Sequence, residues 1–598
     1  MRILLLASAY NSLTQRVHVE LAYRKYEVSL ELALHEDVMT EAVELYQPDL
    51  VIAPFMKKVI PETIWRRYLC IVIHPGIKGD RGPSSLDWAL LTNAKDWGVT
   101  ALQATAEMDA GDIWSSVNFH LPHQSKSCIY RTEVAQAAIE AILQTLNRFK
   151  GGQFVPEVLD YRREDVKGCL RPFIKQKDRA IDWLSDSTAT IARKIRAADS
   201  QPGVLDTIGT DEYYLYGAHE EERLKGVPGE IIAQQRGAIC RATVDGAVWI
   251  SHLKQKKQGN QTFFKLPAAI VLGDRLNDVP EIPCPRKVPS SCKTYREIWY
   301  EEQNEVGYLH FAFYNGAMST DQCDSLRTAF LNACTRPTKV IVFMGGHDFW
   351  SNGIHLNLIE AAENPAEESW RNINAMNDLV LAILTTTSHL TIAAMQGNAA
   401  AGGVMLALAA DRIYARNGIV LNPHYKRMGL YGSEYWTYSL PKRVGLQKAI
   451  ALTENCMPMG TQVAREIGLI DDCFETHPLT FRQQVRSLAQ AIAHSPDYEQ
   501  QLALKTENRL RDKRFKPLED YRKEELEHMK LNFYGADESY HIARRNFVYK
   551  IPPSQTPVHL AKYRNLGSNP DKCTVISTAP EVWSKSQAHL SEVIYEGK

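Results

Sequence analysis

The stretch AAMQGNAAAGGVMLALAADRIYARNGIVLNPHYKRMGLYGSEY, residues 393–435, decides the fold of the C-terminal half of this chain. An uncharged run over residues 390–410 is long enough to suggest a membrane span. Adjacent glycines, small alanines and the amides Gln396 and Asn398 instead indicate a buried turn and helix whose backbone approaches another group closely. The polar part that follows carries Tyr425 and Glu434, which can both move protons. We therefore expect an active site here.

Composition narrows the class of protein. With 598 residues, 44% of them hydrophobic and 23% charged, the chain is typical of a soluble globular protein of three or so domains. The net charge of -1 and the lack of a basic stripe argue against nucleic acid as a partner. The start, MRILLLASAY, lacks the pattern of a signal peptide and reads as a buried strand. The 11 cysteines are scattered without a C-x-x-C pair, so we expect a reduced, cytoplasmic protein with no metal and no membrane association.

Residues 1–160 alternate short apolar runs with helical stretches, which predicts a mostly parallel, Rossmann-like α/β sheet covered on both faces. A polar loop rather than G-x-G-x-x-G leaves the first strand, so a dinucleotide is not favoured. Ligands of such sheets bind at the carboxyl ends of strands. Gln15 is therefore a candidate contact, although a plain surface loop is the stronger explanation of this segment. The expected strands are Arg2–Ser8, Tyr26–Leu32, Leu50–Ala53 and Leu69–Ile73.

His74 follows the fourth strand, at the same expected edge of the sheet. Farther on, Asp109 and Asp112 lie in a tight turn between two strand-like runs. A lone loop histidine is usually structural, and D-x-G-D alone is an ordinary turn. Together, at two strand ends of one sheet, they predict a base with an orienting carboxylate. Ser84 or Ser85 is the expected N-cap of the helix between them.

These residues resemble the formyltetrahydrofolate-dependent formyltransferases, whose pattern is N-x-H, an Arg-Gly turn into a helix, then L-D-x-G-D. The resemblance extends through AIDWLSDSTATIARKIRAADSQPGV and covers about residues 1–272, with Gly229–Lys254 as strands of the small OB-like β-barrel of that family's second domain. It implies N10-formyltetrahydrofolate as a substrate. It implies His74 as base and proton shuttle, with Asp109 holding its protonation state. The candidate folate contacts are Arg81, Ser84, Gly111 and Asp112.

One departure from the formyltransferase pattern affects the chemistry. The Asn two places before the histidine, which binds the formyl oxygen in that family, is Val72 here. Valine cannot donate a hydrogen bond, and losing one oxyanion donor costs about 10²–10³ in rate. Either another donor serves, or the acceptor of the formyl group differs from the usual amine. The turn after the histidine departs as well, because KGDRG replaces S-L-L-P-R-x-R-G.

After a proline-containing segment, the chain from about Tyr295 resembles the crotonase superfamily, which handles acyl thioesters of coenzyme A (CoA). That family stabilises the thioester oxygen with two backbone N–H groups. Here the Gly-containing turn SNGIH points to Ile354, and the Gly-rich turn before a helix points to Gly402. A glycine turn that packs a helix on a strand explains either motif alone, but explains both in order much less well.

The catalytic carboxylates of the hydratase branch are absent, because their positions fall on Met405 and Tyr425. The remaining proton-transfer candidates are Tyr425 and Glu434, unless Tyr425 only fills the pocket and Glu434 caps the next helix. Guanidinium groups match phosphate oxygens, so Arg131, Arg544 and Arg545 are candidate CoA contacts, with a solvated charged face as the alternative.

The two resemblances occur together in a family of hydrogenase maturation proteins. This resemblance implies that a formyl group passes from N10-formyltetrahydrofolate to CoA, and that formyl-CoA is split into CoA and carbon monoxide. The carbon monoxide becomes a ligand of the iron in nickel–iron hydrogenase. The alternatives are an amine formyltransferase fused to an unrelated acyl-CoA enzyme, and a CoA-binding scaffold. The expected domains are residues 1–163 and 164–274 for the formyltransferase half, a 275–294 linker, a crotonase-like domain with C-terminal helices over 295–550, and a tail over 551–598 that we cannot assign.

Overall fold

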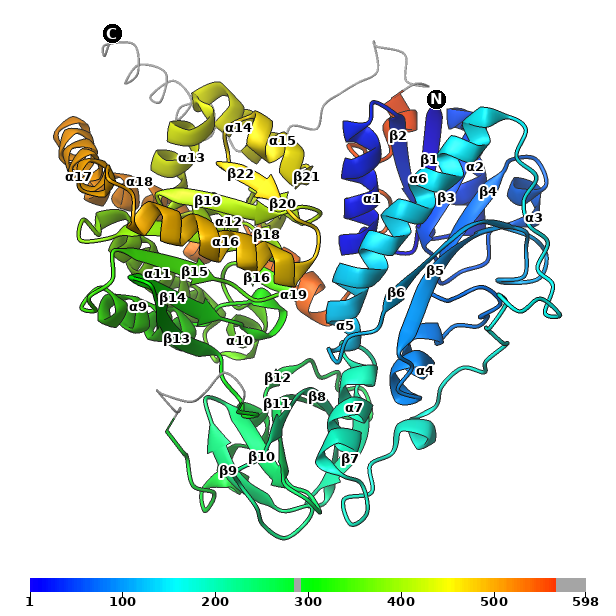
Figure 1. Cartoon of the computed structure of the whole chain (residues 1–598), viewed down its shortest axis with the longest axis horizontal. Helices are drawn as coiled ribbons and strands as arrows, with labels where there is room; N and C mark the ends of the chain where they lie inside the picture. The colour runs from blue at the N-terminus through cyan, green and yellow to red at the C-terminus, as the bar shows by residue number, and fades with distance from the viewer. Residues whose placement is uncertain (284–291, 566–598) are drawn as a thin grey trace.

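The computed structural model describes residues 1–283 and 292–565, which form three bodies, each built around its own sheet (Figure 1). The first sheet has the strand order β2-β1-β3-β4-β5-β6, and its first four strands are parallel. The four strands predicted from sequence are therefore confirmed. The strands are β1 (Arg2–Ala7), β2 (Glu27–Leu32), β3 (Leu50–Phe55), β4 (Cys70–His74), β5 (Asp96–Gln103) and β6 (Ile113–His120).

Both faces of this sheet are buried, as the alternation of strand and helix predicts. Along β1, Ile3 and Leu5 join one core and Leu4 and Leu6 the other, because successive side chains of a strand point to opposite faces. The first core is covered by α1 (Ser12–Tyr23), α4 (Ser85–Leu91) and α6 (Ala135–Gly151), and the second by α2 (Glu36–Tyr46) and α3 (Glu62–Trp65). Two short helical segments, α5 (Lys126–Ile129) and η1 (Tyr130–Val134), precede α6.

The second body is a small antiparallel sheet in the order β7-β8-β11-β10-β9, with β12 paired to β11. The helix α7 (Thr188–Ala198) packs against it through Ile191 and Ile195. Its remaining elements are η2 (Gln176–Arg179), β7 (Val204–Ile208), β8 (Asp211–Glu221), β9 (Ile231–Gln235), β10 (Ala238–Ala242), β11 (Ala247–Gln255), β12 (Leu266–Pro267), α8 (Ala268–Leu272) and η3 (Gly273–Leu276).

The predicted linker is tied to this second body at both of its described ends. Gln234 N–H donates to the Pro280 carbonyl at 2.9 Å, and Ile282 N–H donates back to the Gln234 carbonyl at 2.9 Å. On the far side, Glu222 N–H donates to the Lys293 carbonyl at 3.2 Å. The expected extended spacer is therefore held against the sheet on each side of residues 284–291, which lie outside the described part.

The third body has a six-stranded sheet in the order β13-β14-β15-β17-β19-β22 and a second sheet in the order β16-β18-β20-β21. The uncharged run over residues 390–410 forms β17 and helix α12, which are buried, and between them β18, which is half-buried. In the described ranges, no helix is both long and apolar enough to cross a membrane. The strands are β13 (Ile298–Gln303), β14 (Val306–Phe311), β15 (Val340–Met344), β16 (Phe349–Ser351), β17 (Leu390–Met395), β18 (Asn398–Ala400), β19 (Arg412–Arg416), β20 (Val420–Asn422), β21 (Met459–Gly460) and β22 (Asp472–Phe474).

Helices cover both faces of the larger sheet of the third body. On one face, α16 (Pro478–Ala493) packs Phe481 and Val485 against alternate residues of β14, β15 and β17. The other face carries the largest core of the molecule. The other helical elements of this body are η4 (Tyr314–Gly316), α9 (Thr320–Ala333), α10 (Leu356–Ala361), α11 (Pro365–Thr385), α12 (Gly402–Leu408), η5 (Lys426–Met428), α13 (Trp436–Val444), α14 (Leu446–Asn455) and α15 (Thr461–Glu466).

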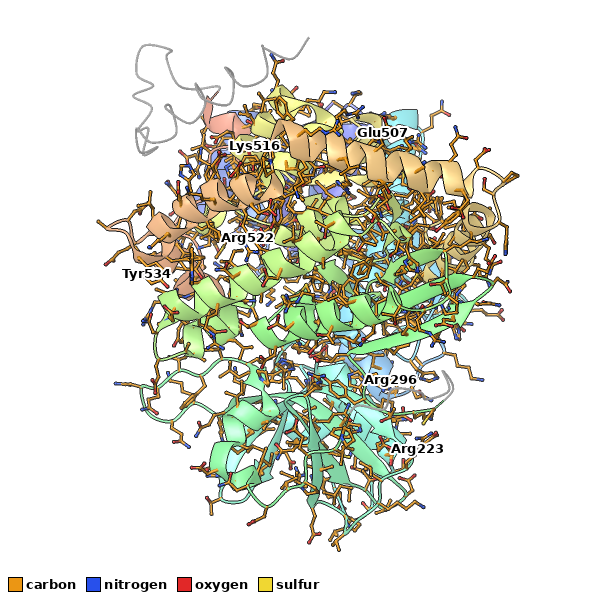
Figure 2. All side chains as sticks on the ribbon, turned by 90° about the vertical axis from the view of Figure 1, so that its left-hand side faces the viewer. Arg223, Arg296, Glu507, Lys516, Arg522 and Tyr534 are labelled. Carbon is orange, nitrogen blue, oxygen red and sulfur yellow. The ribbon has the colours of Figure 1, made fainter. Side chains whose placement is uncertain are left out.

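The charged C-terminal stretch is helical, as predicted, and forms α17 (Tyr498–Phe515), α18 (Leu518–Tyr534) and α19 (Ser539–Tyr549). Figure 2 shows α17 and α18 crossing the outside of the third body, with Glu507, Lys516, Arg522 and Tyr534 along them. Arg522 Nη1 donates to Asp378 Oδ1 of α11 at 2.6 Å, and Tyr534 donates to Glu367 at 2.9 Å. These contacts fix the position of α18 over α11.

The first described part of the predicted tail has a structural role that the sequence did not reveal. Residues 552–565, which we call the C-terminal strap, run from α19 to the edge strand β2 of the first body and end in η6 (Lys562–Asn565). Leu30 N–H donates to the Leu560 carbonyl at 2.9 Å, and Leu32 N–H to Thr556 Oγ1 at 2.9 Å. The fully buried Glu31 accepts hydrogen bonds from Thr556 and from Tyr563. The strap therefore covers an otherwise unpaired sheet edge.

Candidate active sites

His74 is the last residue of β4 and lies where the buried strand gives way to the turn Pro75–Gly76. A Cβ at Gly76 would come within 2.5 Å of both His74 Nε2 and Asp80 Oδ2. A residue with no side chain is therefore needed for the imidazole and the carboxylate of Asp80 to meet. The imidazole is buried, at 5% exposure for the residue as a whole.

Two carboxylates flank the His74 ring. Nε2 lies 2.9 Å from Oδ2 of Asp80, within hydrogen-bond distance, and Nδ1 lies 3.6 Å from Oδ1 of Asp109. The predicted neighbour Asp109 is thus present, but the hydrogen bond in this structure goes to Asp80, which the sequence analysis did not single out. Asp80 was missed although it lies in KGDRG, the turn where the sequence departs from the formyltransferase pattern.

The loop carrying Asp109 is joined to the turn after His74. Gly82 N–H donates to Asp109 Oδ2 at 3.2 Å, and Arg81 Nε donates to the Met108 carbonyl at 3.2 Å. Gly111 is forced by a close approach, since a Cβ there would lie 1.9 Å from the Gln103 carbonyl oxygen. These contacts, with the hydrogen bond from Gln103 N–H to the Asp112 carbonyl at 2.9 Å, bring three predicted folate contacts, Arg81, Gly111 and Asp112, to the end of the sheet that carries Asp109.

Other predicted folate-side residues have defined partners. Ser84 precedes α4 as its N-cap residue, but its Oγ accepts from Ile174 N–H at 3.3 Å rather than from the helix. Val72 lies within β4, half-buried, and its side chain offers no donor.

Gln15 and Arg131 lie between the first and third bodies. Gln15 Nε2 donates to the Tyr10 carbonyl at 3.1 Å, and its Oε1 accepts from Asn422 at 3.2 Å. Arg131 forms an ion pair with Asp348 and stacks over the Phe349 ring, 4.4 Å from its centroid. Its guanidinium therefore already has a carboxylate partner, and its predicted role in binding a phosphate stays a prediction.

In the third body, the two predicted glycine turns meet. A Cβ on Gly353 would lie 3.4 Å from Gly402 N, so the two backbone segments are direct neighbours. Gly402 is the first residue of α12, where N–H groups have no partner within the helix. The other turn is fixed because Met318 N–H donates to the Gly353 carbonyl at 2.9 Å and His355 N–H donates to Asn372 Oδ1 at 2.9 Å. The two turns therefore place Ile354 and Gly402, the predicted donor site, on neighbouring backbone segments, and the donor role of their N–H groups stays a prediction.

Tyr425 and Glu434 lie at this donor site and contact each other. The Tyr425 hydroxyl donates to Glu434 Oε2 at 2.8 Å, and both side chains are buried. A Cβ on Gly402 would lie 2.1 Å from Glu434 Oε1, so the carboxyl group lies against the start of α12. The helix α13 begins after Tyr435 with no side-chain cap, which excludes the reading of Glu434 as its capping residue.

Burial governs the protonation of this pair. Desolvation raises the pKa of Glu434 to about 8, although the hydrogen bond from Tyr425 acts in the opposite direction. Burial, followed by the nearby charge of Glu434, also raises the pKa of Tyr425 well above its ordinary value. At neutral pH the pair therefore has a mostly neutral carboxyl and a neutral phenol.

A second buried carboxylate, Glu525 of α18, holds the loop that carries Glu434. Its oxygens accept from Tyr435 N–H at 2.9 Å and from Thr437 N–H at 2.9 Å. Asn377 of α11 accepts from Glu434 N–H at 2.7 Å. Glu434 and Tyr435 have positive φ of 61° and 58°, so these contacts hold an uncommon backbone conformation. Nothing in the charged sequence around Glu525 distinguishes it from its exposed neighbours.

The predicted arginine pair on α19 does not act as a unit. Arg544 is buried and its Nε donates to Glu360 Oε2 at 2.7 Å. Arg545 is exposed and lies over the Tyr549 ring, 5.3 Å from its centroid. The prediction that both contact CoA stays untested, and only Arg545 has an exposed guanidinium.

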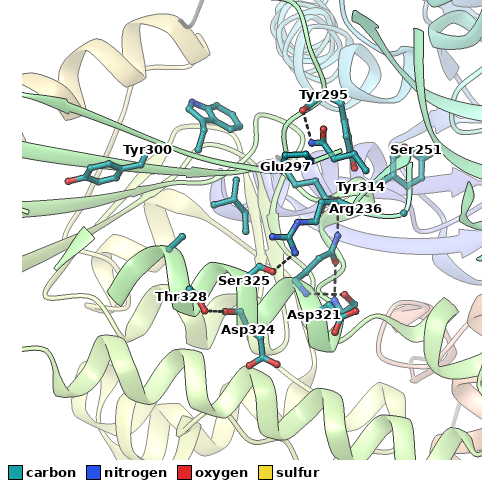
Figure 3. Close-up of a pocket in the computed structure, with 18 of the residues that line it drawn as sticks. Arg236, Ser251, Tyr295, Glu297, Tyr300, Tyr314, Asp321, Asp324, Ser325 and Thr328 are labelled. Atoms are coloured by element: carbon teal, nitrogen blue, oxygen red, sulfur yellow. Dashed lines mark hydrogen bonds between the residues drawn. The ribbon is translucent and has the colours of Figure 1, made fainter. Parts of the chain in front are cut away.

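A large cavity of about 1500 Å³ lies between the second and third bodies, bounded by β11, β13 and α9 (Figure 3). Arg236 spans it by donating to Ser325 of α9 at 2.8 Å. None of the residues singled out from the sequence lines it, although its wall includes His355, which follows Ile354. Within the described ranges, no three His, Cys, Asp or Glu side chains gather as a metal site would require.

Three family models match successive parts of the chain. The model described as Formyl transferase matches residues 1–146, and that of the Formyl transferase, C-terminal domain, matches residues 173–265. The Enoyl-CoA hydratase/isomerase model matches residues 301–550. The two resemblances found in the sequence are therefore confirmed, each over the half of the chain where it was predicted.

Relatives over the full length carry both halves. Hydrogenase maturation factor HoxX of Bradyrhizobium diazoefficiens is 49% identical over 565 residues, which is 94% of this chain and 97% of the relative. The chain belongs to the HypX/HoxX family. The crystal structure of HypX from Aquifex aeolicus with tetrahydrofolic acid superposes with a TM-score of 0.91 at 47% identity and covers 95% of this chain and 100% of its own. Methionyl-tRNA formyltransferase of Citrifermentans bemidjiense, by contrast, is 24% identical over 36% of this chain and 66% of its own.

Proposed function

We propose that this HypX/HoxX family member makes carbon monoxide for hydrogenase maturation in two steps. In the first body, formyl passes from N10-formyltetrahydrofolate to the thiol of CoA. In the third body, formyl-CoA is split into carbon monoxide and CoA. The observation that carries the proposal is the Tyr425–Glu434 pair, a buried carboxyl group that is hydrogen-bonded to a phenol and lies against the backbone of Gly402.

The first step requires a base next to a folate site. The CoA sulfur attacks the formyl carbon, a C–S bond forms, the bond from carbon to N10 breaks, and the thiol proton ends on N10. His74 can carry that proton because its ring lies within reach of carboxylates that stabilise the imidazolium. A thiol needs less assistance than an amine, because part of it is thiolate near neutral pH, which suits a site where Val72 replaces the usual amide donor.

The second step requires a proton to move from carbon to sulfur. The formyl C–H and C–S bonds break, an S–H bond forms, and carbon monoxide leaves, so atoms balance and no oxidant or reductant is consumed. The N–H groups of Ile354 and Gly402 would hold the formyl oxygen while charge builds on it. The ionised form of Glu434 would take the formyl proton, and the carboxyl group so formed, or the Tyr425 hydroxyl bonded to it, would donate a proton to the leaving thiolate.

The hydratase reaction is a weaker candidate for the third body. Met405, at one of the two carboxylate positions of that branch, is fully buried in α12, and the other position is Tyr425. No carboxylate is therefore supplied by either position to activate water. The acid that is present, Glu434, comes from a different loop.

The experiment that tests the proposal is a carbon monoxide assay on the full chain. N10-formyltetrahydrofolate and CoA are added with reduced haemoglobin, which reports carbon monoxide by its absorbance. We expect carbon monoxide only when both substrates are present. Formyl-folate consumed without CoA would instead indicate an amine acceptor, and CoA binding without any turnover would indicate a scaffold.

A further inference from the structure

We propose that Asp80 is the positioning residue of the formyl-transfer site: it fixes His74 with a proton on Nε2, so that Nδ1 is the nitrogen that exchanges protons with the substrates. This inference rests on the formyl transfer proposed above. It reassigns the orienting role that the sequence analysis gave to Asp109, and it places Asp109 on the substrate side of the ring.

The two distances to the ring distinguish the carboxylates. Asp80 Oδ2 is 2.9 Å from Nε2, whereas Asp109 Oδ1 is 3.6 Å from Nδ1, beyond a hydrogen bond. The Asp80 side chain is completely buried, and that of Asp109 is 11% exposed. A carboxylate accepts hydrogen bonds but does not donate them, so the nitrogen facing Asp80 carries the proton. The neutral imidazole then has its lone pair on Nδ1.

The backbone around Asp80 is held more tightly than an ordinary surface turn. A segment of residues 168–171 runs beside it, with Gly168 N–H donating to the Lys78 carbonyl at 2.9 Å and Arg171 N–H donating to the Arg81 carbonyl at 3.0 Å. A Cβ on Gly168 would lie 1.8 Å from Asp80 N, so the two strands of chain are in direct contact. Arg171 Nε lies 3.5 Å from Asp80 Oδ1 and supports its negative charge.

The Nδ1 side of the ring remains available for chemistry. Asp109 uses Oδ2 to accept from Gly82 N–H at 3.2 Å, which anchors it in its own loop. The charged groups facing the imidazole are therefore Asp80 and Asp109, with Arg171 behind Asp80. In the reaction, the thiol proton passes to Nδ1 and then to N10 of the folate, while Nε2–H stays bound to Asp80. A carboxylate that fixes the tautomer in this way orients a histidine base.

The test compares Asp80→Asn with wild type in the full chain, using CoA-dependent formation of tetrahydrofolate as the assay. An Asn side chain keeps the volume but removes the charge and permits the wrong tautomer. We expect kcat to fall by about 10²–10⁴-fold with KM for the folate within about twofold. Asp165→Asn, in an exposed ion pair with Lys78, is the matched control and should leave the assay unchanged.

A second readout does not depend on turnover. In protein labelled with ¹⁵N-histidine, the His74 signals are identified by their loss in His74→Gln. We expect the Nε2–H tautomer in wild type and in Asp109→Asn, and its loss in Asp80→Asn. Wild-type rates or an unchanged tautomer in Asp80→Asn would overturn the inference. If wild type transfers no formyl group to CoA, the proposed function fails, and the tautomer measurement still decides the role of Asp80.

Discussion

The two candidate sites of this chain handle a carboxyl group next to a proton carrier in opposite ways. Around His74, two carboxylates flank one imidazole at the end of a strand, with Arg171 behind one of them. Around Glu434, one carboxyl group lies under helices, against a bare glycine backbone, with only a phenol as its side-chain donor. The His74 site stabilises charged carboxylates, whereas the Glu434 site favours a neutral carboxyl group. Asp80 and Glu434 are both buried, so the difference lies in their partners: Asp80 faces an imidazole and a guanidinium, whereas Glu434 faces a phenol.

The difference matches the chemistry that each site is proposed to perform. Formyl transfer from a folate moves a proton between groups that are already polar, which a flanked imidazole can do. Removing a proton from a formyl carbon requires a strong base in a dry site, and a desolvated carboxyl group has that property once it ionises.

The largest effect should follow from replacing either member of the buried Tyr425–Glu434 pair. Glu434→Gln or Tyr425→Phe should lower carbon monoxide release from supplied formyl-CoA by about 10³-fold or more, because the proton route is cut. Formyl transfer should continue, so formyl-CoA should accumulate when folate and CoA are supplied. The control is Glu454→Gln, which changes a surface ion pair with Lys426. Release of carbon monoxide at the wild-type rate by both variants would separate the pair from the chemistry.

A slightly smaller effect is expected from adding a methyl group at Gly402, where the backbone contacts Glu434. Gly402→Ala places a Cβ 2.1 Å from Glu434 Oε1, so the carboxyl group must move away from the backbone donors. Carbon monoxide release should fall by about 10²–10³-fold, in the range for loss of one oxyanion donor. Gly151→Ala is the matched control, because a Cβ there meets nothing within 4 Å. Equal activity of the two alanine variants would remove the contact from the mechanism.

The pH dependence of the protein's stability should reveal the raised pKa of Glu434 without any substrate. A carboxyl group whose folded pKa is about 8 binds a proton in the folded state that the unfolded state has lost, so stability falls as pH rises from about 4.5 to about 8. Glu434→Gln removes this dependence and should raise the melting temperature, with a gain of about 4 kcal/mol at pH 8 and below about 1 kcal/mol at pH 5. Calorimetric scans of both proteins at the two pH values test it. A gain that does not grow with pH would mean that Glu434 is ionised in the folded state.

The smallest effect concerns the C-terminal strap. Tyr563→Phe removes the hydroxyl that donates to the buried Glu31 at 2.5 Å, which should cost about 1–3 kcal/mol of stability because a buried acceptor loses a partner. Both activities at 25 °C should be unchanged, since neither site contains Tyr563. The melting temperature and the two assays are the measurements. A selective loss of formyl transfer would instead connect the strap to the first site.

Much of the fold could be predicted because its signals are local. The apolar runs of β1 to β4 and the glycine turns at Gly353 and Gly402 each mark their element within a few residues. The parts that could not be predicted depend on distant segments. The partner of Asp80, Arg171, comes from a distant segment of the sequence. Glu525 of α18 likewise accepts a hydrogen bond from the distant 433–437 loop. A charged residue in a helix or turn carries no sign of the contact that folding gives it.

The strap has a consequence for how the chain is made. Leu32 of the edge strand β2 and its strap partner Thr556 are 524 residues apart in the sequence. During synthesis, the first body therefore presents an open strand edge, and the Glu31 carboxyl group lacks its strap partners, until residues 552–565 have been made. Such edges pair readily with other chains. A product cut short after residue 550 would expose this edge permanently.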